Sequence, residues 1–469
     1  IAAIKKLKNG KSSGEEAIPA ECWKAVLEDE MLINEITSFC SMCWQNKQVP
    51  SSWHKARVRC IYKKGDVSDC ENYRPISVLS IGYRIYAAIV LARLKEAGAE
   101  EKIWNIQFGF KSRSGVSEAL LAARRVLEIC LNSKNQHCVF LSLDWAKAFD
   151  SISVDGLLEA LRRFRLPEHV IRIVANIYSD RVFVVQDSGN TSSEHRQSFG
   201  ISQGCPLSPF LFSILMTVLM HDAKRDLLAM FAKAQCENEF GMSELLYADD
   251  TLLVGCERAV LEQYMHFIGK HGACYGMKFN QDKIECLKIN FGEDILNDLG
   301  LAVKSPASLK YLGALITRDG KHCSELNRRI GLAREEFTNL RSCWRRSHLS
   351  LREKFNIYQS LVLSKLFHGL ESICLLSHEK KQLNGFHASC CRKILNLSHS
   401  FISRVSNHHV FRSLQTRPLS NMILQRQLVF FGKLARRAHN DTLRNLFFHL
   451  FSLQLKHPSL RRRGRPQQE

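Results

Sequence analysis

Several features that would assign this chain to a common structural class are missing from its sequence. No apolar run approaches the roughly 20 residues needed to span a bilayer, since the longest, FLFSILMTVLM, covers only residues 210–220. No internal repeat is visible, which argues against a solenoid. The first residue is Ile1, and no charged and hydrophobic leader follows it. We therefore expect no membrane segment, and we expect the sequence to be a fragment of a longer product.

The cysteines lack a metal-binding pattern, although there are 17 of them. Cys40 and Cys43 form a CSMC pair, but no second Cys or His pair follows at zinc-finger spacing. Without a secretory leader, the thiols are expected to be reduced, and most of them buried.

Acidic residues are scarce in the last third of the chain. Residues 1–320 hold 39 basic and 38 acidic side chains, a difference of +1, whereas residues 321–469 hold 27 and 8, a difference of +19. This asymmetry favours a polyanionic partner over a merely solubilising surface, because Lys and Arg that neutralise phosphates dominate nucleic-acid affinity. The RRRGRP segment at 461–466 fits a phosphate contact, a nuclear import signal or simply solvated charge.

Strand and helix patterns alternate without a regular βαβ order. An apolar run at 138–143 is typical of a fully buried strand, and hairpins are indicated near 182–201, 245–255 and 309–320. From about residue 322 onward the pattern is almost wholly helical. The chain is therefore predicted to have an α+β fold in which helices pack on a sheet.

The segment LLYADDTLLVG, residues 245–255, places Asp249 and Asp250 at the turn between two apolar strands. Turn chemistry alone can explain an Asp there. A third acid, Asp144, ends the buried strand at 138–143. If the three carboxylates converge on one sheet, they suit Mg²⁺, and two such ions can support in-line phosphoryl displacement. This chemistry corresponds to nucleotidyl transfer.

Five motifs occur in order along the chain: LSLDWAKAFD, GISQGCPLSP, YADD, MKFNQDKIE and KYLGALIT. Together they resemble the successive motifs of reverse transcriptases. Upstream, YKKGDVSDCENYRPISVLS and QFGF resemble specifically the non-LTR (LINE-type) retrotransposon enzymes. The resemblance covers roughly residues 5–320 well and the helical part more loosely.

The resemblance implies a right-hand polymerase with fingers, a palm with an antiparallel sheet, and a helical thumb. We expect fingers at 1–137, palm with interleaved finger elements at 138–320, thumb at 321–400, and a basic, mostly helical tail at 401–469.

The resemblance also implies residue roles. Asp144, Asp249 and Asp250 would bind two Mg²⁺ ions, and Lys283 would protonate the pyrophosphate leaving group; an ordinary surface lysine is the alternative for Lys283. Further residues would contact the substrates. Lys63 (or Lys64) and Arg74 would bind the triphosphate, and Gln203 and Gly204 would pack against the incoming nucleotide. Phe149 would exclude a ribose 2′-hydroxyl, unless it is a plain core Phe, and the primer would be held by Tyr247, Tyr311, Leu312 and Gly313.

The implied reaction is RNA-directed DNA synthesis: dNTPs are added to a DNA primer on an RNA template. In a parent element it would copy element RNA at a nicked chromosomal site, which favours the nucleus, with the cytoplasm as the alternative. We expect this fragment to lack the endonuclease domain of such elements, and no Cys/His knuckle is expected because Cys391 is the last cysteine.

Other interpretations stay open at this point. One is a group II intron-type reverse transcriptase and maturase; an RNA-directed RNA polymerase is disfavoured by Phe149 and YADD. A third is a catalytically silent RNA-binding relic of the same fold. Glu16–Ala17 and Ile284 depart from the family, which often has Asp-Gly and Thr there, as in a decaying copy.

Overall fold

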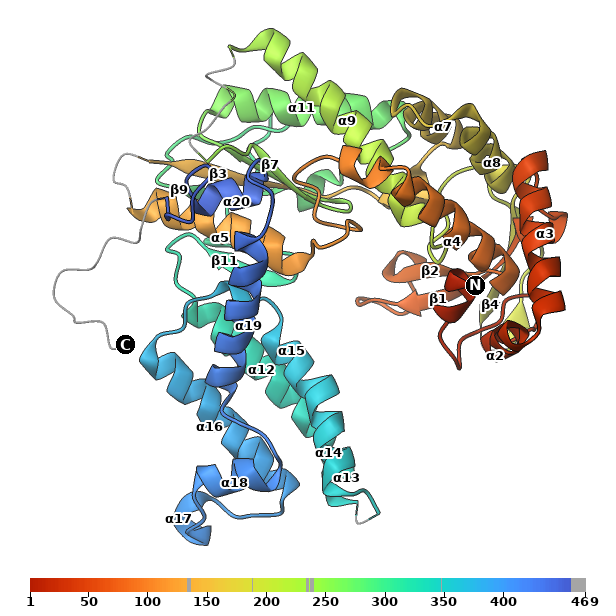
Figure 1. Ribbon diagram of the computed structural model, residues 1–469. Coiled ribbons are helices and arrows are strands. Elements are labelled where there is room, and N and C mark those ends of the chain that lie inside the picture. The colour runs from red at the N-terminus through yellow and green to blue at the C-terminus, as the bar shows by residue number, and fades with distance from the viewer. Residues whose placement is uncertain (133–135, 188, 233–235, 237–239, 347, 457–469) are drawn as a thin grey trace.

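The computed structural model describes residues 1–456 except 133–135, 188, 233–235, 237–239 and 347. The RRRGRP segment therefore lies outside the described residues. Figure 1 shows three groups of elements: a red to orange group at the N-terminus, a yellow to green group around a sheet, and a cyan to blue group of helices that extends away from the sheets.

The N-terminal group is built around the β1–β2 hairpin, whose strands pair antiparallel. After α8 the chain returns to this group, because β4 pairs in parallel with β1. The helix α3 ends at Asn46, and the Asp29 carboxylate caps its start. The elements are α1 (Ala2–Lys5), α2 (Ala20–Ala25), α3 (Glu30–Asn46), β1 (Lys55–Tyr62), β2 (Tyr73–Val78) and α4 (Ile81–Glu96), together with β4 (Val182–Asp187), β5 (Asn190–Thr191) and β6 (His195–Arg196) from later in the chain.

The central group contains a four-stranded sheet in the order β7, β8, β3, β9, and every pair in it is antiparallel. A separate hairpin is formed by β10 and β11. The elements are α5 (Val116–Asn132), β3 (Cys138–Leu143), α6 (Ala148–Ser151), α7 (Val154–Arg163), α8 (Glu168–Tyr178), α9 (Ser208–Met230), β7 (Glu244–Tyr247), β8 (Asp250–Gly255), α11 (Arg258–Cys274), β9 (Glu285–Ile289), β10 (Ser308–Tyr311) and β11 (Ala314–Thr317). The predicted mixture of helices with an antiparallel sheet is confirmed.

Two different hydrophobic cores cover the two faces of this sheet, because successive side chains of a strand point to opposite faces. Val139 and Leu141 on β3 share a core with residues of α9 and α11. Cys138 and Phe140 share the other core with residues of α5 and the β10–β11 hairpin. The uniformly apolar run at 138–143 is thus explained by burial on both faces.

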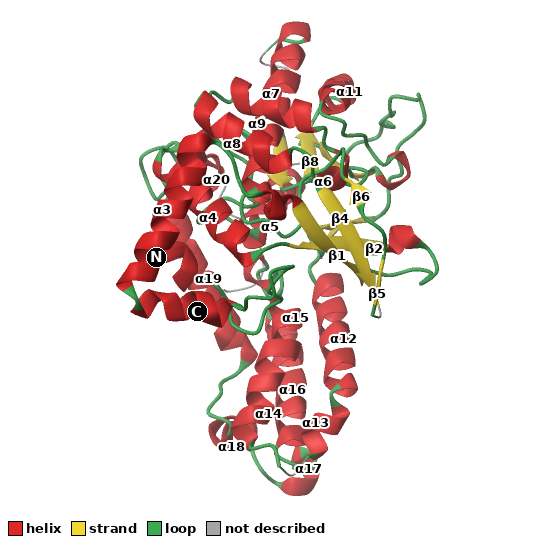
Figure 2. Cartoon of the chain, turned by 90° about the vertical axis from the view of Figure 1, so that its right-hand side faces the viewer, coloured by secondary structure: helices red, strands yellow, loops and turns green. Residues whose placement is uncertain are grey.

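The helical group has a third core, which joins residues from Leu326 to Ile423. Figure 2 shows it as a column of helices below the strands. The elements are α12 (Cys323–Asn339), α13 (Arg341–Arg345), α14 (Leu351–Ile357), a π-helical segment (Tyr358–Leu363), α15 (Ser364–Phe367), α16 (Ser377–Ile394), α17 (Ser400–Ser403), α18 (Asn407–Ser413), α19 (Leu419–Ala435) and α20 (Thr442–Phe447). The almost wholly helical character expected after residue 322 is confirmed.

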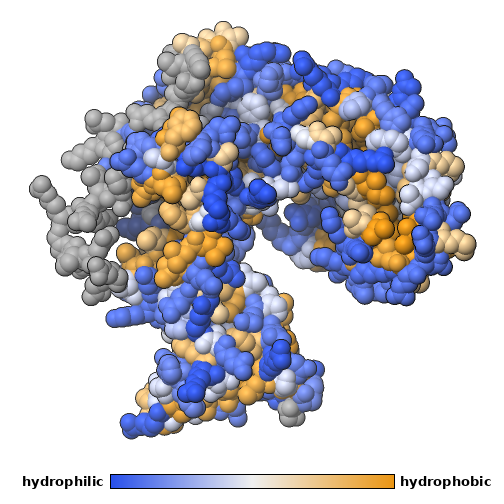
Figure 3. All heavy atoms as spheres, viewed as in Figure 1, coloured by the Kyte–Doolittle hydropathy of each residue, from blue (hydrophilic) through white to orange (hydrophobic). Residues whose placement is uncertain are grey.

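Part of the C-terminal segment packs against the sheet. In Figure 1, α19 runs back along the column toward the sheet. Leu443, Leu446 and Phe448 are then buried in the core that contains α5 and the β3 residue Phe140. The space-filling view in Figure 3 shows that the molecule is hollowed between the column and the N-terminal group. In the part of the chain that the structure describes, no helix is both long and apolar enough to cross a membrane.

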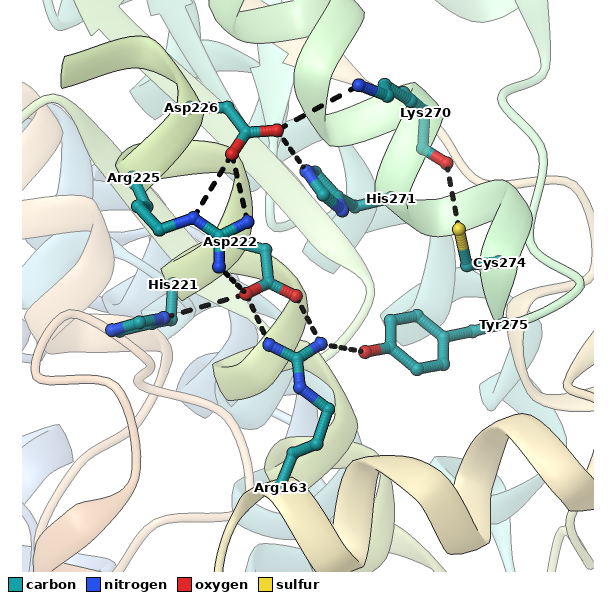
Figure 4. A network of polar contacts seen from close by, with 9 residues as sticks. All are labelled: Arg163, His221, Asp222, Arg225, Asp226, Lys270, His271, Cys274 and Tyr275. Atoms are coloured by element: carbon teal, nitrogen blue, oxygen red, sulfur yellow. Dashed lines mark hydrogen bonds and ion pairs between the residues drawn. The ribbon is translucent and has the colours of Figure 1, made fainter. Parts of the chain in front are cut away.

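A polar network joins α7, α9 and α11 behind the sheet (Figure 4). Asp222 on α9 is 2% exposed and accepts hydrogen bonds from the guanidinium of Arg163, which also donates to the Tyr275 hydroxyl at 3.1 Å. His271 contacts Asp226 through a 2.8 Å bond. Burial acts to raise the pKa of Asp222, but the bonds and charge of Arg163 outweigh it and hold that pKa below its usual value.

Asp222→Asn should lower the free energy of unfolding by about 1–3 kcal/mol at pH 7, because Arg163 loses its buried carboxylate partner. The pKa of Asp222 is lowered by folding, so this contribution is complete above about pH 4 and is lost as the pH falls through the folded-state pKa. Urea unfolding of both proteins from pH 7 to pH 3 measures the difference. Glu159→Gln removes an exposed ion pair on α7 and should cost less than about 0.5 kcal/mol; equal losses in the two variants contradict the prediction.

Candidate active site

Three aspartates lie where β3 ends and the β7–β8 hairpin turns. Asp144 directly follows β3, and the register that pairs Leu143 with Thr251 places it beside Asp250. Tyr247 pairs with Asp250 across the hairpin, so Asp249 lies in the two-residue turn between them. The structure thus brings together the three acids that the sequence singled out.

The carboxylates repel one another. Loss of surrounding water raises the pKa of Asp249, and the charge of Asp144 raises it further, while Arg74 acts to lower it. Asp250 has an exposed surface, but protein atoms crowd it; this loss of water, followed by the charges of Asp249 and Asp144, raises its pKa to about 6. The basic side chains near the site do not balance the negative charge of the three carboxylates. The site therefore favours the binding of a cation.

Lys283 ends a short turn that precedes β9. Its Nζ lies 3.1 Å from Oδ2 of Asp144, and the lysine side chain is 65% exposed. The neighbouring Asn280 donates its backbone N–H to the Asp144 carbonyl at 2.7 Å. The segment at 280–283 is therefore docked on the strand end that carries Asp144.

Lys63 and Arg74 lie in the β1–β2 hairpin of the N-terminal group, and both are exposed. Arg74 influences the pKa of Asp249, and Lys63 acts to lower the pKa of Asp150. Of the predicted triphosphate contacts, Arg74 is thus close enough to act electrostatically on one of the three acids, whereas Lys63 acts on Asp150.

Phe149 and Gln203 lie close together, because Gln203 contacts Asp150, the residue that follows Phe149. The Phe149 ring stacks on Phe212 with centroids 4.5 Å apart. Gln203 donates from Nε2 to both carboxylate oxygens of Asp150, at 2.9 and 3.0 Å. At Gly204, φ is +137° and an added Cβ would lie 2.3 Å from the Ser77 carbonyl oxygen. We expected Gly204 to permit close approach to a base pair; the close approach seen here is to the backbone of β2.

The β10–β11 turn holds the other predicted primer contacts, Leu312 and Gly313. Tyr311 precedes it; burial, followed by the charge of Asp250, raises the pKa of the Tyr311 phenol, which places this hairpin near the acids. The Gly313 carbonyl accepts from Arg328 at 2.6 Å, and the Leu312 carbonyl contacts His368 at 2.9 Å. The hairpin thus connects the acids to the helical column.

Sequence reasoning assigned no role to Gln107, which is 1% exposed. Its Oε1 accepts from the backbone N–H groups of Ala248, at 2.9 Å, and Gly109, at 2.8 Å, and its Nε2 donates to the Ala248 carbonyl at 3.3 Å. An added Cβ at Gly109 would lie 2.3 Å from the Ala248 nitrogen. The only signal for this clamp was a polar residue in the QFGF motif.

The donor set fits a hard divalent cation. In the described ranges no three His, Cys, Asp or Glu side chains already surround a common point as metal ligands. Mg²⁺ usually takes only one or two carboxylates and completes its shell with water and substrate phosphates. The oxygen-only chemistry and the raised pKa values of Asp249 and Asp250 agree with such a partly formed site.

Comparison with known proteins points to one family. Residues 61–316 match the family described as reverse transcriptase (RNA-dependent DNA polymerase). The chain is 27% identical to the RNA-directed DNA polymerase from mobile element jockey of Drosophila melanogaster, covering 71% of this chain and 37% of the relative. It is 28% identical to the Pol polyprotein of the type-2 retrotransposable element R2DM of the same fly, covering 50% and 21%.

A third relative, a probable RNA-directed DNA polymerase from transposon BS of Drosophila melanogaster, is 25% identical over 69% of this chain and 36% of its own length. The chain thus spans less than two fifths of each of these relatives. A solved structure of apo telomerase from Candida tropicalis aligns with a TM-score of 0.42 and 15% identity, covering 62% of this chain and 59% of that one. The family match and the antiparallel sheet confirm the predicted right-hand polymerase fold, and the mobile-element relatives confirm the resemblance to non-LTR retrotransposon enzymes.

Asp250→Asn should stabilise the metal-free protein at pH 8 by about 1 kcal/mol after allowance for solvent screening, because it removes one of three repelling charges. Folding raises the pKa of Asp250 to about 6, so the benefit is complete above that pH and disappears below about pH 3, where the carboxyl is protonated in both states. Urea unfolding in EDTA measures it. A variant that is less stable than the parent at pH 8 contradicts the assigned repulsion.

Proposed function

The chain belongs to the reverse transcriptase (RNA-dependent DNA polymerase) family, and we propose that it adds dNTPs to a DNA 3′-hydroxyl on an RNA template by a two-metal mechanism. The observation that carries the proposal is the meeting of Asp144, Asp249 and Asp250 at the edge of one sheet, with Arg74 acting on the same site. A non-catalytic scaffold has no use for three repelling acids.

Asp144 and Asp249 would hold two Mg²⁺ ions, with Asp250 as a nearby third acid. Bound there, the ions would activate the primer hydroxyl and stabilise the leaving pyrophosphate. Arg74 and Lys63 bind the triphosphate and neutralise its charge as it develops. Lys283 donates a proton from Nζ to the leaving pyrophosphate; its 3.1 Å contact with Asp144 supports this placement.

Selection of the nucleotide rests on a second set of residues. The Phe149 ring, held against Phe212, acts as the barrier to a ribose 2′-hydroxyl. Gln203 and Gly204 pack against the incoming nucleotide, and Asp150 fixes the Gln203 amide. Tyr247 and the turn at 311–313 hold the primer end, which is supported by the anchoring of that turn on the helical column.

In this assignment residues 1–137 are fingers, 138–320 palm with interleaved finger elements, and 321–400 thumb. The parallel pairing of β4 with β1 supports the interleaving. The hollow in Figure 3 offers the space for template and primer between fingers and thumb. We assign the parent protein to copying of element RNA at a nicked chromosomal site, which requires a nuclear location.

The test is extension of oligo(dT) on poly(rA) with dTTP and Mg²⁺. Asp249→Asn should reduce the rate by at least about a hundredfold, because metal-assisted stabilisation of a phosphoryl transition state contributes several kcal/mol. Asp155→Asn, which removes an exposed acid at the start of α7, should extend the primer like the parent. Equal activity of parent and Asp249→Asn overturns the proposal. Salt-sensitive binding without extension by the parent favours the RNA-binding relic.

A further inference from the structure

The end of the helical column farthest from the sheets contains a pocket of about 780 Å³. Its walls come from the end of α12, from α13, from α14 and from the end of α16. Figures 1 and 2 both place α13 at that far end. Because α12 has 17 residues, which corresponds to about 25 Å of helix, the pocket is well separated from the aspartates.

Four basic side chains line the pocket and no acidic one does: Arg341, Arg345, Lys354 and Lys393. Across the described part of the chain, none of the four forms an ion pair with an acid. Lys354 is 9% exposed and donates from Nζ to the Trp344 carbonyl at 3.1 Å. The pocket therefore concentrates positive charge that the protein itself leaves unbalanced, which is the electrostatic footprint of a polyanion site.

The aromatic side chains in the wall of the pocket are already packed against each other and hydrogen-bonded within the protein. Phe337 and Trp344 stack with centroids 4.7 Å apart and planes 17° apart. The Trp344 indole N–H donates to the Phe337 carbonyl at 2.8 Å, and both rings are buried. Neither ring is free to intercalate between bases. The available contacts are cationic, and cations contact phosphate oxygens independently of base identity.

We propose that this pocket binds the phosphodiester backbone of the template or primer strand, remote from the site of nucleotide addition. This proposal rests on the proposed function, because that function identifies the polyanion as a template or primer strand. Its volume exceeds that of a single phosphate group and falls in the range of ligand pockets, so it can admit a backbone segment. The pocket adds affinity for the substrate and leaves the chemical step unchanged.

The experiment measures binding without dNTP or Mg²⁺. A labelled (rA)40·(dT)20 duplex is titrated with the full chain at several KCl concentrations, using fluorescence anisotropy. The variant Arg341→Ala/Arg345→Ala/Lys393→Ala should weaken binding about tenfold or more and reduce the slope of log Kd against log [KCl] by about 2–3, because each lost phosphate contact releases one counterion fewer. A mixed-sequence duplex of the same length should show the same change.

The control is Lys380→Ala/Lys381→Ala/Arg412→Ala, which removes three exposed cations of the same column that do not line the pocket. It should leave the slope within about 1 of the parent value. If the pocket variant has a lower Tm than the parent, the single variant Arg345→Glu replaces it in the experiment, because Arg345 is exposed. An unchanged slope in a folded pocket variant, or an equal decrease in the control, overturns the proposal. A parent that binds but does not extend primer counts against the polymerase assignment only.

A second inference rests on the clamp around the hairpin turn. The Ala248 φ of +57° is an unfavourable left-handed conformation for a residue with a Cβ, and Gln107 bonds both backbone groups of that residue. The backbone on either side of Gln107 also pairs with β7, since Phe108 N–H donates to the Leu246 carbonyl at 2.8 Å and Leu246 N–H to the Ile106 carbonyl at 3.0 Å. We infer that Gln107 is a positioning residue, which holds the turn so that Asp249 meets Asp144.

Gln107→Leu keeps the side chain's approximate size but leaves the backbone groups of Ala248 and Gly109 unpaired. If Gln107 positions the turn, kcat should fall at least about tenfold with little change in the KM for dTTP, because only the transition-state geometry is lost. The Mg²⁺ concentration that gives the half-maximal rise in Tm should also increase. Gln48→Leu, at an exposed glutamine, should change neither quantity.

A purely structural role predicts a different result: a lower Tm, but an unchanged kcat and Mg²⁺ midpoint in the folded variant. That result overturns this second inference. The kcat measurement rests on the proposed function, because it requires a parent that extends a primer. The Mg²⁺-dependent Tm tests the inference even if the parent does not extend a primer.

Discussion

The pairing of β3 with β8 is the constraint on which the rest of the structure depends. Antiparallel register places Asp144 beside Asp250, and the hairpin adds Asp249. The resulting repulsion opposes folding, as the raised pKa values of Asp249 and Asp250 indicate. It is tolerated because β3 is buried between two hydrophobic cores, whose packing stabilises the sheet by far more than the repulsion costs.

Segments that are distant in sequence fix the geometry around these acids through hydrogen bonds to backbone groups of the site. Asn280 bonds the Asp144 carbonyl, Gln107 clamps Ala248, and Ser77 bonds the Gln203 carbonyl at 2.8 Å. Backbone contacts of this kind are short and directional, so they restrict the frame more tightly than apolar packing alone. The candidate site is therefore held mainly by hydrogen bonds to its backbone, and its exposed side chains remain available for substrate.

The sheet edge and the far end of the helical column carry charges of opposite sign. The sheet edge gathers acids and needs cations, whereas the far end of the column gathers Arg and Lys without acidic partners. The two regions are joined through the β10–β11 turn, whose carbonyls contact Arg328 and His368 of the column. In the proposed function, one polyanion contacts both regions: the column binds its backbone, and the sheet edge acts on its end.

The sequence by itself determined the elements and the chemistry: the buried strand at 138–143, the hairpin that carries Asp249 and Asp250, the helical last third, and the motif order that indicated the family. These are local properties, because side-chain periodicity and turn preference depend on near neighbours. Only the tertiary structure decided that Gln107 clamps a turn 141 residues away, that Gly204 meets Ser77, and that α20 returns to α5. It also decided that four cations share a pocket. Such contacts join segments distant in the chain, and their partners follow from how the cores pack, which no local pattern specifies.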